Sequence, residues 1–288
     1  MNVMTILMQG TLLGGLYALF AIGLSLTFGI MRVVNIAHGD LITLAAFAAL
    51  VVTDTLAISP FVALAVVVPL FFALGYLLQR GLLNRTLGDS ILPPLLVTFG
   101  LSVIIQNVLL EVFGANIRRL PVGDLETASL QLPGGIAIGV FPLIVFVAAL
   151  ICLGALQYLL YHTRLGRAFR ATSDDPETAE LMGIDNRHLY ALAMGIALAF
   201  TALAGVLFAI RTTFDPASGP IRLIFAFEAV IIGGLGSLWG TLLGGVVLGI
   251  AQSIGAAISL EWQILAGHIA FMIILVLKPD GLFPRTQD

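Results

Sequence analysis

Six polar side chains interrupt otherwise apolar stretches of this sequence, and they are the first candidates for chemistry. An ionisable or amide group within an apolar segment is costly, so such groups are kept mainly where they line a path, bind a solute or pair with each other. We therefore treat them as candidates for a pathway through the protein. The six residues are Asn35, His38, Asp40, Gln106, Asn107 and Glu228.

Three of these residues crowd into the stretch NIAHGD at 35–40, close to an apolar boundary. A chain break at membrane depth frees backbone groups, which is tolerated only inside protein or beside water. Asn35, His38 and Asp40 could therefore line or gate a pathway, with Asn35 capping the helix that follows. A tight cytoplasmic turn with interfacial polar residues is the alternative interpretation.

Glu228 is the one acid placed well inside an apolar run. It could accept a hydrogen bond from a solute, or it could pair with Arg211 or Arg222. Alternatively, it lies at a shortened helix end and pairs across a dimer. Gln106 and Asn107 are more typical of hydrogen bonds between helices than of solute ligands.

The residue types of catalytic and metal sites do not occur in a pattern that indicates an enzyme. No nucleophile and base stand at facing helical positions, and the histidines are too scattered for a metal site. The sequence also lacks the motif GxxxxGKS or GxxxxGKT, so the chain does not bind ATP by a phosphate loop. We expect no catalytic residue, no metal and no cofactor bound by this chain. The single cysteine, Cys152, excludes an internal disulfide.

The composition places these residues in a membrane protein. Of the 288 residues, 59% are hydrophobic and only 10% are charged, whereas a soluble domain has roughly 25% charged residues. The apolar segments predict an all-α polytopic protein with about eight or nine transmembrane helices. The count depends on how the chain runs through 35–52 and 223–258, where we expect broken helices. Residues 1–288 would then form a single transmembrane domain.

The longest polar interruption lies at 162–188 and predicts a short helix. It offers a capping aspartate, a proline for the first turn, glutamates near the positive end and a glycine at the exit. A helix of about eight residues is unstable in water by itself, so we expect it to dock onto the membrane domain or a second protein. An ordinary solvated loop is the alternative. The residues are Asp174 or Asp175, Pro176, Glu177, Glu180 and Gly183.

The basic residues indicate an orientation, because cytoplasmic loops carry an excess of lysine and arginine. With 162–188 in the cytoplasm, nine of the thirteen basic residues fall on that side. The N-terminus would then lie outside, the C-terminus inside, and 113–139 would be an external loop. A weak similarity between GIMRVVNIAHG at 29–39 and AIRTTFDPASG at 209–219 suggests an inverted repeat, since the two segments would face opposite sides.

Four stretches of the chain follow one another in an order typical of one group of permeases. They are NIAHGD at 35–40, GRAFRATSDDPETAELMGID at 166–185, IIGGLGSLWGTLLGGVVLGIAQ at 231–252 and KPDGLFPR at 278–285. Together they make the chain resemble the LivH-type permeases of bacterial ABC importers for branched-chain amino acids. The resemblance implies a multi-pass protein of the inner (cytoplasmic) membrane that forms half of an alternating-access pathway. Relatives of this type also import urea, amides or carboxylates, so the resemblance does not identify the solute.

The resemblance also implies partners and a coupling element. The partners would be a LivM-like second permease, two cytoplasmic ABC ATPases that bind ATP and Mg, and a periplasmic substrate-binding protein, with no nucleic acid. The segment 166–185 would insert into the ATPase. Its coupling residues would be Arg167, Arg170, Asp174, Asp175, Glu177, Glu180, Leu181, Met182 and Gly183. The rival interpretation is a self-contained secondary transporter or channel, in which Glu228 or His38 couples an ion.

Overall fold

Residues 3–88, 90–132 and 136–283 are described by the computed structural model, and they form a bundle that is almost entirely helical. The α-helices are α1 (Val3–Met31), α2 (His38–Leu56), α3 (Pro60–Gly81), α4 (Leu92–Phe113), α5 (Val140–His162), α6 (Arg164–Asp174), α7 (Pro176–Leu181), α8 (Asn186–Arg211), α9 (Gly219–Gly233), α10 (Leu238–Ile258) and α11 (Trp262–Leu277). Two short 3-10 helices are η1 (Leu83–Arg85) and η2 (Gly123–Glu126). Two antiparallel strands, β1 (Ser129–Leu132) and β2 (Ile136–Gly139), complete these elements.

Within the described ranges, seven helices are long and apolar enough to cross a membrane: α1, α2, α3, α4, α5, α8 and α10. The prediction of an all-α polytopic membrane protein is confirmed. Helices α9 and α11 have only 15 and 16 residues. The expected count of eight or nine is therefore reached only when these two shorter helices are included.

Helices α1 and α8 form the centre of the bundle. Their most apolar windows are 83% and 78% buried, whereas those of α3, α4 and α5 are only 22–28% buried. Every side chain of α1 from Leu16 to Leu26 is buried. The peripheral helices instead present rows of apolar side chains outward, as expected for surfaces that face lipid.

Glycines allow α10 to approach two other helices closely. A methyl group at Gly14 would overlap the backbone of Val246, and one at Gly244 would overlap the carbonyl of Ala229. Helix α10 therefore packs backbone to backbone on both α1 and α9. Small residues at such contacts are typical of membrane helix packing, where close approach supplies the attraction.

The self-similar segments 29–39 and 209–219 form the same local structure. Each begins at the end of a central helix, interrupts it and leads into the next helix, α2 or α9. In the first, Asn35 Oδ1 accepts a hydrogen bond from Ala37 N at 3.0 Å. In the second, Asp215 Oδ1 accepts one from Ala217 N at 2.8 Å. The two segments align without a gap. In both, the side chain of an Asn or Asp residue closes an Asx turn at the same position of the break.

The helices around these breaks pair crosswise. Helix α1 packs on α10, and α8 packs on α3, as two copies related by a two-fold rotation do. Gly23 of α1 lies against Thr201 of α8, and Phe20 lies against Phe208, with ring centroids 5.8 Å apart. Later residues of α1 therefore meet earlier residues of α8, and the two helices run antiparallel. The bundle contains an inverted repeat.

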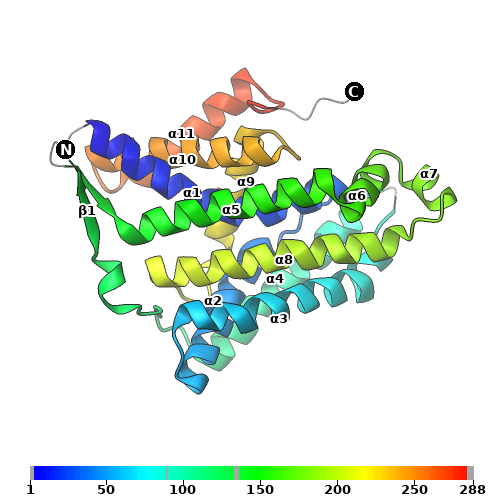
Figure 1. Cartoon of the computed structure of the whole chain (residues 1–288), viewed down its shortest axis with the longest axis horizontal. Coiled ribbons are helices and arrows are strands. Elements are labelled where there is room, and N and C mark those ends of the chain that lie inside the picture. Colours follow the sequence, from blue (N-terminus) through cyan, green and yellow to red (C-terminus); the bar gives the residue numbers. More distant parts are fainter. Residues whose placement is uncertain (1–2, 89, 133–135, 284–288) are drawn as a thin grey trace.

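The two ends of the bundle carry different structures (Figure 1). Strand β1 and the N-terminal end of α1 lie at one end, which we call the hairpin end. Helices α6 and α7 lie at the other, which we call the α7 end. The segment 113–139, expected as a loop, contains η2 and the two strands, and a single β-bridge joins Arg118 to Phe214.

Candidate functional site

The start of α2 carries a buried polar cluster. Asp40 lies in the first turn of α2, and its Oδ2 accepts a hydrogen bond of 2.5 Å from the Ser102 hydroxyl of α4. Gln106 donates to the same hydroxyl at 3.2 Å. His38 Nε2 donates to the carbonyl oxygen of Phe20 at 2.7 Å, which attaches α2 to the middle of α1. Two of the predicted pathway residues, Asp40 and Gln106, therefore share the Ser102 hydroxyl, whereas His38 binds α1.

Two other predicted pathway residues lie differently from the expectation. Asn35 is buried, but its side chain closes the turn before α2 instead of capping the helix, whose N-cap is Ala37 without a side-chain bond. Asn107 is exposed and donates to Val103 O within α4 at 2.8 Å. It lines a cavity of about 170 Å³ beside Asp215, to which Gln106 also contributes, but it has no hydrogen bond to Asp40 or Ser102 among the described residues. Asn107 is therefore not part of the cluster.

The beginning of α9 lies directly against this cluster. A methyl group added to Gly219 would overlap the Asp40 carboxylate, whose buried Oδ1 has no hydrogen-bond partner among the described residues. Ser102 was not predicted from the sequence. Its position one turn before Gln106 on the same helical face was the available signal.

Glu228 pairs with a histidine and not with an arginine. Its Oε1 lies 2.5 Å from His268 Nδ1 of α11, and no ion pair joins it to Arg211 or Arg222 in the described part of the chain. Its Oε2 is buried without a hydrogen-bond partner there. Next to this pair, the Tyr17 hydroxyl donates to Gln252 Oε1. The interior acid therefore connects α9 to α11 through His268.

The polar segment 162–188 contains two helices where one was expected. The additional helix, α6, has Thr163 as its N-cap, and the Thr163 hydroxyl accepts a hydrogen bond from Gly166 N at 3.0 Å. Phe169 and Thr172 are buried on one face of α6, while Arg167 points outward. Charged residues alternate with the buried ones along α6, so the amphipathic pattern is hard to recognise in the sequence. The helix is stabilised by packing against α5 and α1.

Helix α7 lies where the short helix was expected. Asp175 is its N-cap and accepts a bond from Thr178 N at 3.1 Å. The Thr178 hydroxyl also donates to Asp175, and these bonds hold the pKa of the Asp175 carboxyl below its ordinary value. Gly183 adopts φ of +87°, a conformation that favours glycine at a helix exit.

The tip of α7 presents apolar side chains to the outside. Leu181 is 87% exposed and Met182 is 79% exposed, whereas Ala179 is buried against the protein itself. The acidic residues Asp174, Glu177 and Glu180 are also on the outer surface of this region. The result is an exposed apolar tip with acidic surroundings.

Asn186 connects α6, α7 and α8. Its Oδ1 accepts a bond from the Thr172 hydroxyl at 2.9 Å, and its Nδ2 donates to Pro176 O at 2.6 Å. The Ser173 hydroxyl in turn donates to Gly29 O at 2.7 Å. These contacts join α7 to α8, and they join α6 to both central helices, α1 and α8. The sequence contained no signal for them, because each depends on the tertiary arrangement.

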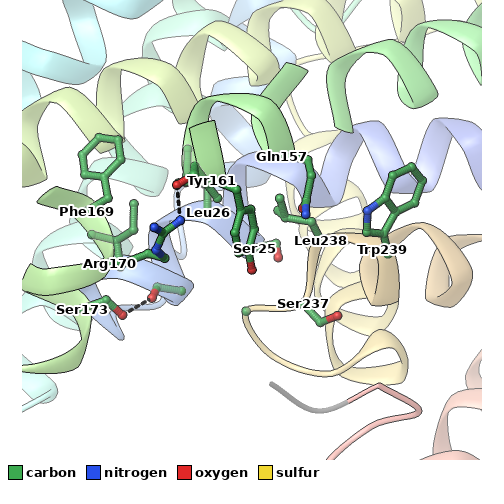
Figure 2. A pocket seen from close by; sticks show the side chains of 14 residues that line it. Ser25, Leu26, Gln157, Tyr161, Phe169, Arg170, Ser173, Ser237, Leu238 and Trp239 are labelled. Atoms are coloured by element: carbon green, nitrogen blue, oxygen red, sulfur yellow. Dashed lines mark hydrogen bonds between the residues drawn. The ribbon is translucent and has the colours of Figure 1, made fainter. Parts of the chain in front are cut away.

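A cavity of about 300 Å³ lies at the α7 end and is lined by α1, α5, α6 and the start of α10. Figure 2 shows the side chains that line it. Arg170 lines it and donates from Nη1 to Leu160 O at 2.5 Å. Its guanidinium also lies 4.9 Å from the centroid of the Tyr161 ring. Arg170 therefore satisfies a free carbonyl near the end of α5, which ties α6 to α5.

The chain matches a known family along most of its length. Residues 6–277 match the family described as branched-chain amino acid transport system / permease component. The chain is 27% identical over 294 residues to the high-affinity branched-chain amino acid transport system permease protein BraD of Pseudomonas aeruginosa, covering 98% of this chain and 95% of that protein. It is 28% identical over 300 residues to the corresponding protein LivH of Escherichia coli K12, covering 97% and 94%.

Two further comparisons are more distant. The permease protein LivM of Escherichia coli K12 is 28% identical over 125 residues, which covers 43% of this chain and 29% of LivM. Among solved structures, PsaBC from Streptococcus pneumoniae in complex with Fab aligns with a TM-score of 0.50 at 13% identity, covering 96% of this chain and 92% of that one. This last likeness concerns the fold alone.

Proposed function

This chain belongs to the permease components of branched-chain amino acid transport systems, and we propose that it forms half of the membrane pathway of an ATP-driven importer. The proposed solute is a branched-chain amino acid, because the full-length relatives BraD and LivH are named for that transport. The structural observation that carries the coupling part of the proposal is the exposed tip of α7. A short helix with Leu181 and Met182 outward is built to be covered by another protein.

We assign the α7 end to the cytoplasmic side of the inner membrane. Arg164, Arg167 and Arg187 cluster there, and basic residues favour the cytoplasmic side. The hairpin end then faces outward, together with the N-terminus and the segment 113–139. The C-terminus lies inside.

The assembly needs partners that supply the energy and complete the pathway. Two cytoplasmic ATPases would bind ATP and Mg and contact α7, since this chain has no phosphate loop of its own. A LivM-like permease would form the other half of the pathway, and the LivM likeness supports this pairing. A periplasmic binding protein would deliver the solute to the hairpin end.

The contacts of α7 suggest how its movement reaches the pathway. A shift of α7 pulls on Asn186 at the start of α8, and it moves the adjoining α6, whose Ser173 is bonded to Gly29 at the end of α1. Both helices run into the two chain breaks, beyond which α2 and α9 begin in mid-bundle beside Asp40. Opening and closing of these breaks would expose the pathway alternately to the two sides.

The deciding experiment is a pull-down of the tagged chain from native membranes, followed by L-leucine uptake by the reconstituted complex. We expect a second permease and two ATPases to copurify, and uptake to require ATP hydrolysis. Uptake by the chain alone, without ATP, would instead support a self-contained transporter. The matched control is the same complex carrying an ATPase that binds but does not hydrolyse ATP.

A further inference from the structure

Another cavity, of about 350 Å³, lies between α1, α8, α9 and α11. Its volume falls within the roughly 300–1,000 Å³ of small-ligand pockets. Its wall combines apolar and aromatic side chains with two arginines. The lining residues that matter here are Leu16, Tyr17, Phe20, Phe208, Arg211, Arg222 and Phe225. Both arginines line this one cavity, although a turn of the chain separates α8 from α9.

Neither arginine has an anionic partner within the part of the chain that the structure describes. Arg211 Nη1 and Arg222 Nε are both buried without a hydrogen-bond partner, and neither guanidinium forms an ion pair. Asp215 contributes negative potential at Arg222 without pairing with it. Arg222 also lies over the Phe208 ring, 4.4 Å from its centroid. Both side chains are only partly exposed, and a cation withdrawn from water without an anionic partner is costly unless a ligand compensates it.

The inverted repeat shows that the fold itself does not require these arginines. Continuing the gap-free alignment of 29–39 with 209–219 places Met31 opposite Arg211 and Ile42 opposite Arg222. The equivalent half of the molecule builds a similar break and helix start with apolar side chains at these two positions, although Arg32, His38 and Asp40 lie nearby. The arginine pair therefore belongs to one half only, which points to a ligand.

The cavity adjoins the outer end of the bundle in our orientation. Arg211 also lines a neighbouring cavity of about 440 Å³, which is bordered by Gly139 at the end of β2 and by Pro142 at the start of α5. A solute arriving at the hairpin end would pass this outer cavity before it reached the arginine pair. Guanidinium groups match the geometry of a carboxylate and bind it with two parallel hydrogen bonds.

We propose that this cavity binds the carboxylate of the imported solute, with Arg211 and Arg222 on the carboxylate oxygens and the apolar side chain among Phe20, Phe208 and Phe225. The proposal rests on the proposed import function and names the part of the solute that this permease recognises. The ring of Phe225 lies 5.0 Å from that of Tyr17, so the apolar wall is continuous across α1 and α9. An anionic lipid head group offers a similar charge, and the test separates the two.

The test uses the purified complex, so that selection by the binding protein does not enter. Phenylglyoxal modifies accessible arginines, and mass spectrometry reports the modification of Arg211 and Arg222 separately. L-leucine should protect both residues, whereas L-leucinamide, which lacks the carboxylate, should not. Equal protection by both compounds, or by neither, would overturn the proposal. Protection by phosphatidylglycerol vesicles but not by L-leucine would assign the site to lipid and also overturn it.

Uptake measurements provide the second readout. Arg211→Gln and Arg222→Gln should lower ATP-driven L-leucine uptake roughly ten-fold or more, because each removes a charge-assisted hydrogen bond to the solute. Arg118→Gln, an exposed arginine of the same end, is the control and should leave uptake unchanged. If the Gln variants fail to fold, Arg211→Lys and Arg222→Lys keep the charge, and the protection pattern of the unaltered protein still decides.

The two proposals fail in different ways. L-leucine uptake by the unaltered complex together with unprotected arginines would reject the carboxylate site and leave the import function standing. Absence of L-leucine uptake by the unaltered complex would reject the import function itself.

Discussion

Gly39 and Gly219 touch through their backbones at the point where α2 and α9 begin. A methyl group on Gly39 would overlap the carbonyl oxygen of Gly219, and one on Gly219 would overlap Asp40. The two halves of the inverted repeat therefore meet at a pair of equivalent glycines. No larger residue fits between the helices without moving one half against the other.

This contact predicts that Gly39→Ala and Gly219→Ala destabilise the protein. Overpacking a close contact costs about 1–3 kcal/mol, and here the obstructing atoms belong largely to the backbone. We expect a lower Tm in detergent together with reduced uptake. Gly100→Ala in α4 is the control, because nothing lies within 4 Å of its added methyl group. A normal Tm for both variants would show that the halves separate easily.

The exposed tip of α7 predicts a docking defect without a folding defect. Leu181→Asp and Met182→Asp should abolish coupling between ATP hydrolysis and uptake, since both side chains are exposed and await an apolar partner. Membrane insertion and Tm should stay unchanged. Leu260→Asp, an 82% exposed leucine beyond α10, is the control. Normal ATP-driven uptake by both tip variants would contradict the coupling role.

Asn186 should be needed for the connection between α7 and α8. Asn186→Ala removes two hydrogen bonds and leaves the buried Thr172 hydroxyl without its acceptor, at a cost of about 1–3 kcal/mol. Asn186→Asp keeps the acceptor for Thr172 but loses the donor to Pro176. We expect the aspartate variant to retain more thermal stability and yet to loosen α7, measured by hydrogen exchange. Equal exchange in α7 for all three proteins would contradict the connection.

Asp175 should make the start of α7 sensitive to acid. Hydrogen bonds from Thr178 lower the pKa of the Asp175 carboxyl in the folded protein. The ionised carboxylate therefore stabilises the start of α7 fully at pH values above its unfolded-state pKa, near 3.8. This stabilisation is lost as the pH falls through the lower pKa of the folded state. Hydrogen exchange at the Thr178 backbone amide should therefore lose protection as the pH falls through the folded-state pKa of Asp175, and not at higher pH. Asp175→Asn should remove this pH dependence, and an unchanged profile for that variant would refute the assignment.

The contact between Glu228 and His268 predicts that removing one side chain lowers the thermal stability more than replacing both. His268→Ala leaves the buried Glu228 carboxylate without its partner, and a buried acceptor left unsatisfied costs about 1–3 kcal/mol. The double variant Glu228→Leu/His268→Leu removes both groups and should unfold at a higher temperature than His268→Ala. Thermal unfolding of the purified proteins measures the difference. Additive losses would indicate that the two side chains act independently.

Local sequence determined the class of the protein and several of the points at which its helices begin and end. Hydropathy depends on consecutive residues, so the long spans could be predicted before any packing was known. The cap at Asp175 and the exit at Gly183 likewise involve residues only a few positions apart, whereas Asn35 was expected to cap α2 and instead closes the turn before it. The inverted repeat could be suspected for the same reason.

Tertiary structure alone decided which polar groups meet. Asp40 finds Ser102, and Glu228 finds His268 instead of an arginine, because these pairs join different helices. Helix α6 was not predicted, because it is stabilised by the helices α5 and α1 that pack against it. In an apolar bundle the partner of a polar group is set by which helix faces pack together, and no spacing along the chain records that choice.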